Sequence, residues 1–362
     1  MVDFKGFSVI GDKGELIDIL LRKKIPSRVH NLEIFHDPEI VNIIAERFGL
    51  DENLDKKDPS YKNRLYIIMH QFMGFDAFHV PFRDKGFFDE PLNYLNDTAS
   101  KETSRGQRAW TEEHKGPIQG WQDFEKYPWP DLKNIDFSCL EWMQKNVPEN
   151  MGCYELTAHI LEELTFLLGY ETLCMKIYDE PNLVDAILEK VGSFYLKHTE
   201  ALCTFSCVPF IWASDDMGFK TSTLVSPDFL SKKIFPWHKK CAEVAHKCGR
   251  AYLLHACGKL DAVMADLIDY VSIDAKHSFE DTIMEVTDAY KLYHDRISIL
   301  GGIDVDFLCR SDEKSIRQRI RKTLDVCMPQ GGYCLGTGNT VANYIPIDNY
   351  LAMVDEGRKY CM

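Results

Sequence analysis

Two short apolar runs of the sequence end beside side chains that could bind a metal ion. His255 and Cys257 follow the run Ala251–Leu254 two positions apart, so on a strand both side chains point to the same face. Cys334 lies in a second short run that ends in glycines. One imidazole and two thiols are three of the ligands that zinc takes, with a fourth position left for water or substrate. The spacing therefore predicts a zinc site if the fold brings the two runs together, although a lone buried cysteine is more often inert.

Eight short apolar runs have the character of buried strands, and amphipathic helical patterns separate most of them. Apolar strands joined by helices indicate parallel β-structure, and eight such units favour an α/β protein with a (β/α)8 TIM barrel over an open, doubly wound sheet. The absence of a Gly-x-Gly-x-x-Gly segment after the first run also counts against the open sheet. The eight predicted strands are Arg28–Phe35, Asp76–Val80, Met151–Glu155, Val208–Ala213, Ala251–Ala256, Tyr270–Asp274, Ile297–Gly301 and Gly332–Leu335.

All 362 residues are expected to form one barrel domain. Residues 1–60 carry helical patterns together with the first strand and are interpreted as an N-terminal helical extension. Residues 83–135 are irregular, with recurring Gly, Trp and Pro, and are interpreted as an elaboration of the barrel. Because so long a connection is usually functional, we expect it to form a lid, an arm that holds a homodimer together, or both.

Polar side chains at the predicted strand ends are candidates for the chemistry, because barrel active sites lie where the strands end. Glu155, Asp215 and Asp216 would make this mouth acidic, and could complete the metal ligands, orient a substrate or protonate a leaving group. Each could equally cap a helix or bind water. Gly336 and Asn339 belong to a Gly-Thr-Gly-Asn turn that could cradle a phosphate or another part of a cofactor, although a tight turn that needs glycine is the alternative.

The composition excludes several classes of protein. The chain is 45% apolar and 27% charged, which is typical of a globular protein with a sizeable core. A formal net charge of −14 argues against a nucleic-acid partner and against an anionic membrane surface. No apolar run is long enough to cross a bilayer, and residues 1–5 lack the pattern of a signal peptide. We therefore expect a cytoplasmic protein whose 12 cysteines are reduced.

Several motifs resemble the uroporphyrinogen decarboxylase superfamily and, within it, the zinc-dependent corrinoid methyltransferases. The resemblance extends over most of the chain. The residues that carry it are Arg28-Val29-His30, Tyr127-Pro128-Trp129-Pro130-Asp131, Asp215-Asp216-Met217-Gly218, Ser226-Pro227, Leu254-His255-Ala256-Cys257-Gly258, Gly301-Gly302-Ile303-Asp304 and Gly336-Thr337-Gly338-Asn339.

This resemblance implies a barrel fold and a zinc ion bound by His255, Cys257 and Cys334. It also implies methyl transfer between a small-molecule donor or thiol acceptor and cobalamin, as in methanogenesis or O-demethylation. Because the sequence has no Asp-x-His-x-x-Gly cobalamin-binding segment, the cobalamin is expected on a separate corrinoid protein. Zinc could either bind an acceptor thiolate or polarise a leaving group.

Two other functions stay open. The first is a metal-free decarboxylase similar to the founding enzymes of the superfamily, in which Asp215 or Asp216 would stabilise a protonated pyrrole. The arginine-rich segment that grips propionates in those enzymes has no counterpart after Arg28, and an acidic mouth suits a polycarboxylate poorly. The second is a barrel without catalytic activity that binds a corrinoid protein or a small ligand and whose zinc is structural.

Overall fold

The computed structural model describes residues 9–81, 86–89, 92–97, 99 and 107–360. Six parallel strands form the main sheet, in the order β10-β9-β8-β7-β6-β5. A second parallel pair joins β1 to β4, and β4 is continuous with β5 except for Glu155. The strands are β1 (Ala77–His79), β4 (Gly152–Tyr154), β5 (Leu156–Thr157), β6 (Phe210–Ser214), β7 (Ala251–His255), β8 (Ala275–His277), β9 (Ser298–Leu300) and β10 (Tyr333–Cys334).

The first predicted strand, Arg28–Phe35, lies beside β10 and extends the ring. Asn31 forms a parallel bridge with Leu335, and the Leu335 amide donates to the carbonyl of His30 at 2.8 Å. Eight parallel segments with helices between them make a (β/α)8 TIM barrel, which confirms the predicted fold class.

One predicted strand is wrong in position. The residues expected to form strand Tyr270–Asp274 instead end a helical turn at Val271, and β8 begins at Ala275. Leu267 and Val271 are both buried at helical spacing, so the alternation of apolar residues near Ile273 suggested a strand too early. The true strand places His277, rather than Asp274, at its C-terminal end.

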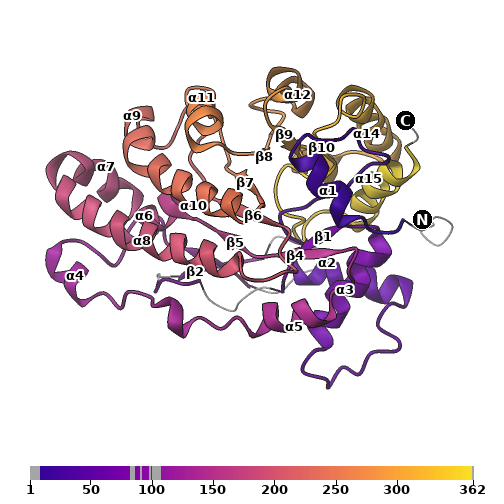
Figure 1. Cartoon of the computed structure of the whole chain (residues 1–362), viewed down its shortest axis with the longest axis horizontal. Helices are drawn as coiled ribbons and strands as arrows, with labels where there is room; N and C mark the ends of the chain where they lie inside the picture. The colour runs from indigo at the N-terminus through magenta and orange to yellow at the C-terminus, as the bar shows by residue number, and fades with distance from the viewer. Residues whose placement is uncertain (1–8, 82–85, 90–91, 98, 100–106, 361–362) are drawn as a thin grey trace.

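Helices surround the sheet (Figure 1), with α14 and α15 side by side near both termini and α6, α7 and α8 together at the opposite end of the view.

An antiparallel hairpin, β2 (Leu92–Asn96) and β3 (Gln107–Thr111), lies within residues 83–135, part of which is outside the described residues. The helices are α1 (Lys13–Leu20), α2 (Pro38–Phe48), α3 (Tyr61–Met73), α4 (Trp121–Lys126), α5 (Ser138–Asn146), α6 (Ile160–Leu168), α7 (Tyr170–Asp179), α8 (Pro181–Leu202), α9 (Pro227–Phe229), α10 (Phe235–Lys247), α11 (Met264–Asp266), α12 (Val286–Tyr293), α13 (Val305–Arg310), α14 (Glu313–Cys327) and α15 (Ile347–Lys359), with short turns η2 (Leu132–Asn134), η3 (Leu230–Ile234) and η4 (Leu267–Val271).

The interior of the barrel is apolar at its N-terminal end and polar at its C-terminal end. Inward positions of β6 carry Phe210 and Trp212, and those of β7 carry Leu253, all fully buried. Burial of each such side chain contributes roughly 1.5–3 kcal/mol. Since inward positions recur every second residue, the next inward residues are Ser214 on β6 and His255 on β7. The fold therefore directs polar side chains into the mouth.

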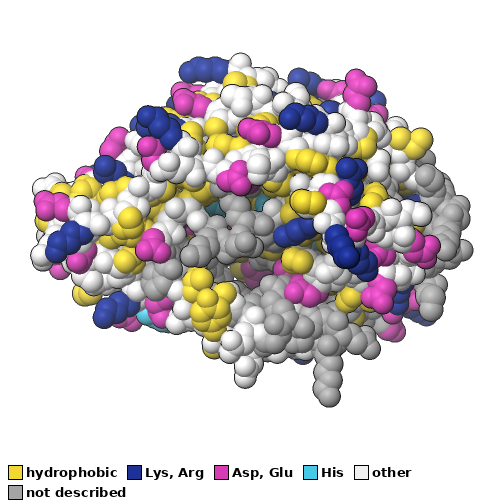
Figure 2. Space-filling view, turned by 90° about the horizontal axis from the view of Figure 1, so that it is seen from below, with side chains coloured by type: hydrophobic (Ala, Val, Ile, Leu, Met, Phe, Trp, Pro, Cys, Tyr) yellow, Lys and Arg dark blue, Asp and Glu magenta, His cyan; other side chains and the backbone are white. Residues whose placement is uncertain are grey.

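Helix α1 closes the other end. Its Leu16, Ile19 and Leu20 belong to the interior cluster, and the Ser298 hydroxyl donates to the carbonyl of Ile19 at 2.9 Å. Within the predicted N-terminal extension, α1 thus forms a plug for the barrel floor. Within the described residues, no helix combines the length and the apolar character needed to cross a bilayer. Figure 2 shows acidic, basic and apolar side chains interspersed over the face seen from below.

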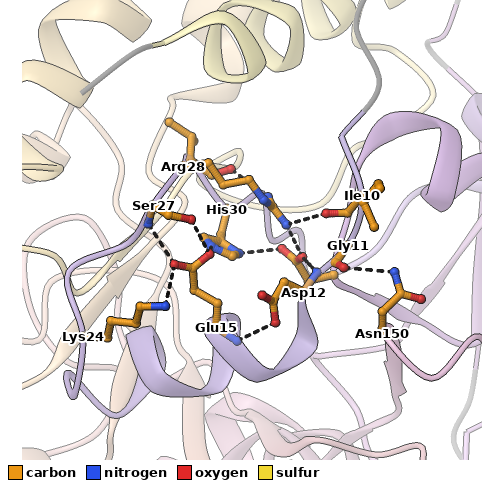
Figure 3. A network of polar contacts seen from close by, with 11 residues as sticks. Ile10, Gly11, Asp12, Glu15, Lys24, Ser27, Arg28, His30 and Asn150 are labelled. Carbon is orange, nitrogen blue, oxygen red and sulfur yellow. Dashed lines mark hydrogen bonds and ion pairs between the residues drawn. The ribbon is translucent and has the colours of Figure 1, made fainter.

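A buried polar network ties this plug to the first two strands (Figure 3). The His30 ring lies between two carboxylates, with Nδ1 at 2.7 Å from Asp76 and Nε2 at 3.1 Å from Glu15. Arg28 forms an ion pair with the same Asp76. The Glu15 carboxylate also accepts from the amide of Ser27 at 2.9 Å and from its hydroxyl at 2.8 Å. Burial alone would raise the pKa of Glu15, but these hydrogen bonds prevail and lower it to about 2.

Candidate metal centre at the barrel mouth

Three side chains at the ends of neighbouring strands form a group that could hold a metal ion. His255 ends β7, Cys257 follows two residues later, and Asp216 follows the end of β6. The ligand atoms all lie within 4.8 Å of one another, with His255 Nε2 at 3.5 Å from Cys257 Sγ and at 3.4 Å from Asp216 Oδ1. Zinc bonds of 2.0–2.3 Å in a tetrahedron separate the ligand atoms by roughly 3.3–3.7 Å. The arrangement and the N, S, O donor set therefore fit zinc.

A chain of hydrogen bonds fixes the tautomer of His255. The carbonyl of Thr337 can only accept, so His277 Nε2, at 3.0 Å from it, carries a proton. Burial and the neighbouring His255 hold the pKa of His277 well below its ordinary value, so the ring is neutral and its Nδ1 is an acceptor. That atom lies 2.7 Å from His255 Nδ1, which must donate the hydrogen. With Nδ1 as the donor to His277, Nε2 is the nitrogen of His255 that faces Cys257 and Asp216 and that could bind a metal.

The sulfur of Cys257 is surrounded by hydrogen-bond donors. The Ser278 hydroxyl lies 3.4 Å from Sγ, and the Asn339 amide nitrogen lies 3.5 Å from it. Burial and the Asp216 charge raise the pKa of Cys257 well above its ordinary value, so a cation is needed for the sulfur to become a thiolate ligand. Lys276 lies nearby, fully occupied by three backbone carbonyls at 3.0–3.1 Å, and burial lowers its pKa to about 8.

Backbone geometry holds this group together. The carboxylate of Asp216 accepts from the Cys257 amide at 2.8 Å, so the loops after β6 and β7 are joined directly. Burial opposes ionisation of Asp216, but its contacts with His255 and Cys257 prevail and hold its pKa well below the ordinary range. Gly258 has a φ of +87°, and a Cβ there would lie 2.1 Å from the backbone of Gly218. Glycine is therefore required for the two loops to approach.

Cys334 lies outside this group, so its role as a zinc ligand, expected from the sequence, stays a prediction. Among the described residues the candidate ligands are Asp216, His255 and Cys257. Cys334 is fully buried in the apolar interior cluster, and its backbone pairs with Leu300. Burial raises its pKa, and the charges that act on it most are Asp76 and Arg28 of the barrel floor. The segment that carries Cys334 contacts the metal group at Asn339, whose amide nitrogen lies 3.5 Å from Cys257 Sγ.

Of the three predicted acidic residues, only Asp216 lies in the metal group. Asp215 is fully buried and accepts from the amide of Leu161 at 2.8 Å and from that of Glu162 at 2.9 Å, and it is also held by His238 Nε2 at 2.8 Å. Asp215 therefore holds the first turn of α6, which favours the helix-capping alternative for this residue. Glu155 is directed towards His198 of α8 at 3.7 Å.

The Gly-Thr-Gly-Asn turn is not an anion cradle. A Cβ on Gly336 would lie 2.2 Å from the carbonyl of Leu32, so glycine lets the last strand pack against the first. The amide of Thr337 already donates to Glu33 at 2.9 Å, and that of Gly338 donates to a backbone carbonyl at 2.7 Å. These contacts favour the tight-turn alternative for Gly336, and Asn339 lies beside the metal group, with its amide nitrogen 3.5 Å from Cys257 Sγ.

A cavity of about 1110 Å³ is lined by one member of the metal group, His255. Ser214 and Asn339 also contribute to its lining. The charged residues of its lining are mostly acidic: Glu162, Glu280, Asp281, Asp304 and Asp306, with Lys220 and Arg310. Aromatic side chains also contribute to the wall: Phe35, Phe279, Phe307 and Tyr344. The cavity can therefore admit a small molecule with an apolar part and place it near His255.

Sequence reasoning missed several residues of this site. His277 and Ser278 were overlooked because β8 was predicted a few residues too early, and a strand over Ala275–His277 would have revealed a second inward histidine. Glu162 lines the cavity and is paired with His159, whose Nδ1 lies 3.0 Å from its carboxylate. No spacing signal marked either residue, since both lie at the start of a helix whose orientation only the fold reveals.

The comparisons with known proteins agree with this architecture. The family model for uroporphyrinogen decarboxylase (URO-D) matches residues 161–360, more than half of the chain, and the protein therefore belongs to that family. Among solved structures, a methyltransferase from Methanosarcina mazei has a TM-score of 0.73 at 14% sequence identity, covering 96% of this chain and 98% of that chain. This likeness supports the barrel fold.

A second solved structure, a putative vitamin-B12-independent methionine synthase from Listeria monocytogenes, has a TM-score of 0.49 at 14% identity and covers 91% of this chain and 94% of its own. The comparison with curated proteins finds no match. The family match confirms the resemblance to the uroporphyrinogen decarboxylase family, and its range includes every residue of the candidate metal group.

Proposed function

We propose that this protein is a zinc-dependent methyltransferase that moves a methyl group between a small molecule and the cobalamin of a separate corrinoid protein. The observation that carries the proposal is the convergence of His255 Nε2, Cys257 Sγ and Asp216 Oδ1, together with a cavity that His255 lines. A site with three protein ligands and free space beside it is typical of catalytic rather than structural zinc. This distinguishes the proposal from a barrel without catalytic activity.

In the proposed site the ligand charges would balance a divalent cation. The Cys257 thiolate and the Asp216 carboxylate would supply two negative charges, and a metal-bound imidazole of His255 would add none. Zinc bound there would act as a Lewis acid on a substrate oxygen or sulfur. His277 would hold the His255 ring in place, and Ser278 and Asn339 would direct hydrogen bonds to the Cys257 sulfur.

The cavity would take the small-molecule substrate. Its aromatic side chains suit an apolar portion of that molecule, and His255 of the metal group contributes to its lining. Since the sequence has no Asp-x-His-x-x-Gly segment, the corrinoid would arrive on a partner protein that docks over the mouth. The acidic lining disfavours the metal-free decarboxylase, because a polycarboxylate substrate would meet like charges.

The test combines metal analysis with a panel of methyl donors and acceptors. Purified protein is expected to contain about one zinc per chain and to lose both metal and activity in Cys257→Ala. Methoxylated aromatics, methylamines and thiols, assayed with free cob(I)alamin and with methylcobalamin, should identify the substrate class and the direction. Protein free of zinc that decarboxylates a porphyrinogen, or that transfers methyl groups equally well without metal, would overturn the proposal.

A further inference from the structure

A second reactive group, distinct from the metal ligands, faces the same cavity. Glu162 lies in the first turn of α6 and lines the cavity together with His255 and Asn339. Its side chain is 22% exposed, so it is accessible to a ligand without being freely solvated. The residue is thus placed to touch a molecule held above the metal group.

One loop positions both Glu162 and a metal ligand. Asp215 holds the amides of Leu161 and Glu162 at 2.8–3.0 Å, and the next residue, Asp216, belongs to the metal group. Because Asp215 already accepts from these first-turn amides, the Glu162 carboxylate is not needed as a helix cap. His238 braces Asp215 from α10, and the Tyr252 hydroxyl lies 2.9 Å from the other nitrogen of His238. The separation between Glu162 and the metal group is therefore built into the scaffold.

The surroundings of Glu162 suit a proton donor. His159 Nδ1 lies 3.0 Å from Oε2, which leaves Oε1 for the acid proton. Burial raises the pKa of Glu162, and the charges of Asp216 and Asp215 raise it further, against the lowering effect of His159, to about 7. A carboxyl group with a pKa near neutrality is well matched to general acid catalysis.

We propose that Glu162, positioned by His159, donates a proton to the leaving oxygen of a methyl ether or of methanol, so that the substrates are O-methyl donors. This inference rests on the proposed methyl transfer. The C–O bond breaks with its electron pair going to oxygen, and the oxygen takes the proton of the Glu162 carboxyl group. The methyl group bonds to the cobalt of the cob(I)alamin acceptor, which is formally oxidised from I to III.

The proposed role separates O-methyl donors from other donors. An alkoxide or a simple phenolate is a poor leaving group at neutral pH unless it is protonated as the bond breaks. A quaternary ammonium or sulfonium donor leaves as a neutral amine or thioether and needs no proton. An acid beside the cavity is therefore useful for O-methyl donors and unnecessary for quaternary ammonium or sulfonium donors.

The test measures leaving-group dependence in Glu162→Gln, with free cob(I)alamin as the methyl acceptor. Substrates are methoxybenzene and cyano-substituted methoxybenzenes, whose phenols differ in acidity. The variant should lower kcat by about 10²–10⁴-fold for methoxybenzene and by less than about tenfold for the most acidic phenol. Zinc content should equal that of the wild type. The matched control is Glu163→Gln, the adjacent carboxylate, which accepts from the Tyr195 hydroxyl and should retain normal rates.

The outcomes separate this inference from the proposed function. An equal loss across the substrate series, or no loss, overturns the role of Glu162 while leaving methyl transfer intact. Wild-type protein that uses methylamines or methylated thiols but no methoxy compound overturns the substrate class. Wild-type protein that moves no methyl group from any donor contradicts the proposed function itself. His159→Gln provides a second variant, expected to reproduce a weaker form of the same leaving-group dependence.

Discussion

The Nδ1 atoms of His255 and His277 lie 2.7 Å apart, and this contact determines which nitrogen of His255 faces the candidate metal group. Neighbouring strands β7 and β8 pair these two residues in register. The carbonyl of Thr337 then fixes the proton on the far side of His277. His277 and the carbonyl of Thr337 thus orient the imidazole of His255 towards the candidate metal group.

Replacement of His277 should weaken metal binding without removing a ligand. In His277→Ala, His255 loses the acceptor that fixes its tautomer, and zinc affinity should fall by about 10–100-fold. Competition with a chromophoric chelator measures this change. His246→Gln is the control, because His246 is half-exposed and bonded to Asp274, away from the mouth. Equal zinc affinities for His277→Ala and the wild type would contradict the proposed support of His255 by His277.

The adjacent aspartates should respond in opposite ways. Asp216→Asn should lose most of its zinc. Asp215→Asn should keep its zinc and lose roughly 1.5–3 kcal/mol of unfolding free energy, because charged hydrogen bonds to the first turn of α6 are weakened. Metal analysis and denaturant unfolding of both variants test these two expectations. Loss of zinc in Asp215→Asn alone would reverse the two assignments.

Cys334 should prove dispensable for the metal. Since it lies in the apolar interior, Cys334→Ala should retain the full zinc content while costing on the order of 1 kcal/mol of stability through a small cavity. Cys257→Ala, measured in parallel, should lose the metal. A zinc-free Cys334→Ala protein would restore the ligand set expected from the sequence.

The barrel floor should make the protein sensitive to acid. The folded-state pKa of Glu15 is lowered from 4.5 to about 2, so its contribution is complete above about pH 4.5 and is lost as the pH falls towards 2. A shift of this size corresponds to a contribution on the order of 3 kcal/mol. Glu15→Gln should therefore be less stable at pH 7 and show a flatter loss of stability between pH 5 and 3. Glu313→Gln, at the exposed Glu313 on α14, is the control for urea unfolding.

Much of the barrel followed from local patterns, because apolar runs and amphipathic helices are properties of neighbouring residues. Six of the eight predicted strands are strands at the predicted positions, the first is an extended segment that bridges Leu335 at Asn31, and His255 and Cys257 lie close together as their spacing predicts. The one displaced strand hid His277. The predicted strand Tyr270–Asp274 is wrong because Val271 belongs to the buried face of a helical turn, whereas Val271 and Ile273 together look like the alternating apolar residues of a strand.

The rest of the site depends on how distant segments meet. Cys334 and Asn339 are five positions apart on one segment, and only the depth of β10 in the barrel decides which of them reaches Cys257. Asp215 and Asp216 have the same side chain but opposite orientations after β6. Such choices are set by inter-strand register and loop packing, which a single sequence does not display.

X-ray absorption at the zinc edge tests the central claim most directly. The proposed site predicts one zinc per chain, bound to a single sulfur with the remaining ligands nitrogen or oxygen, and disappearance of the sulfur shell in Cys257→Ser. Two sulfurs per zinc, or an active protein that contains no metal, would contradict it.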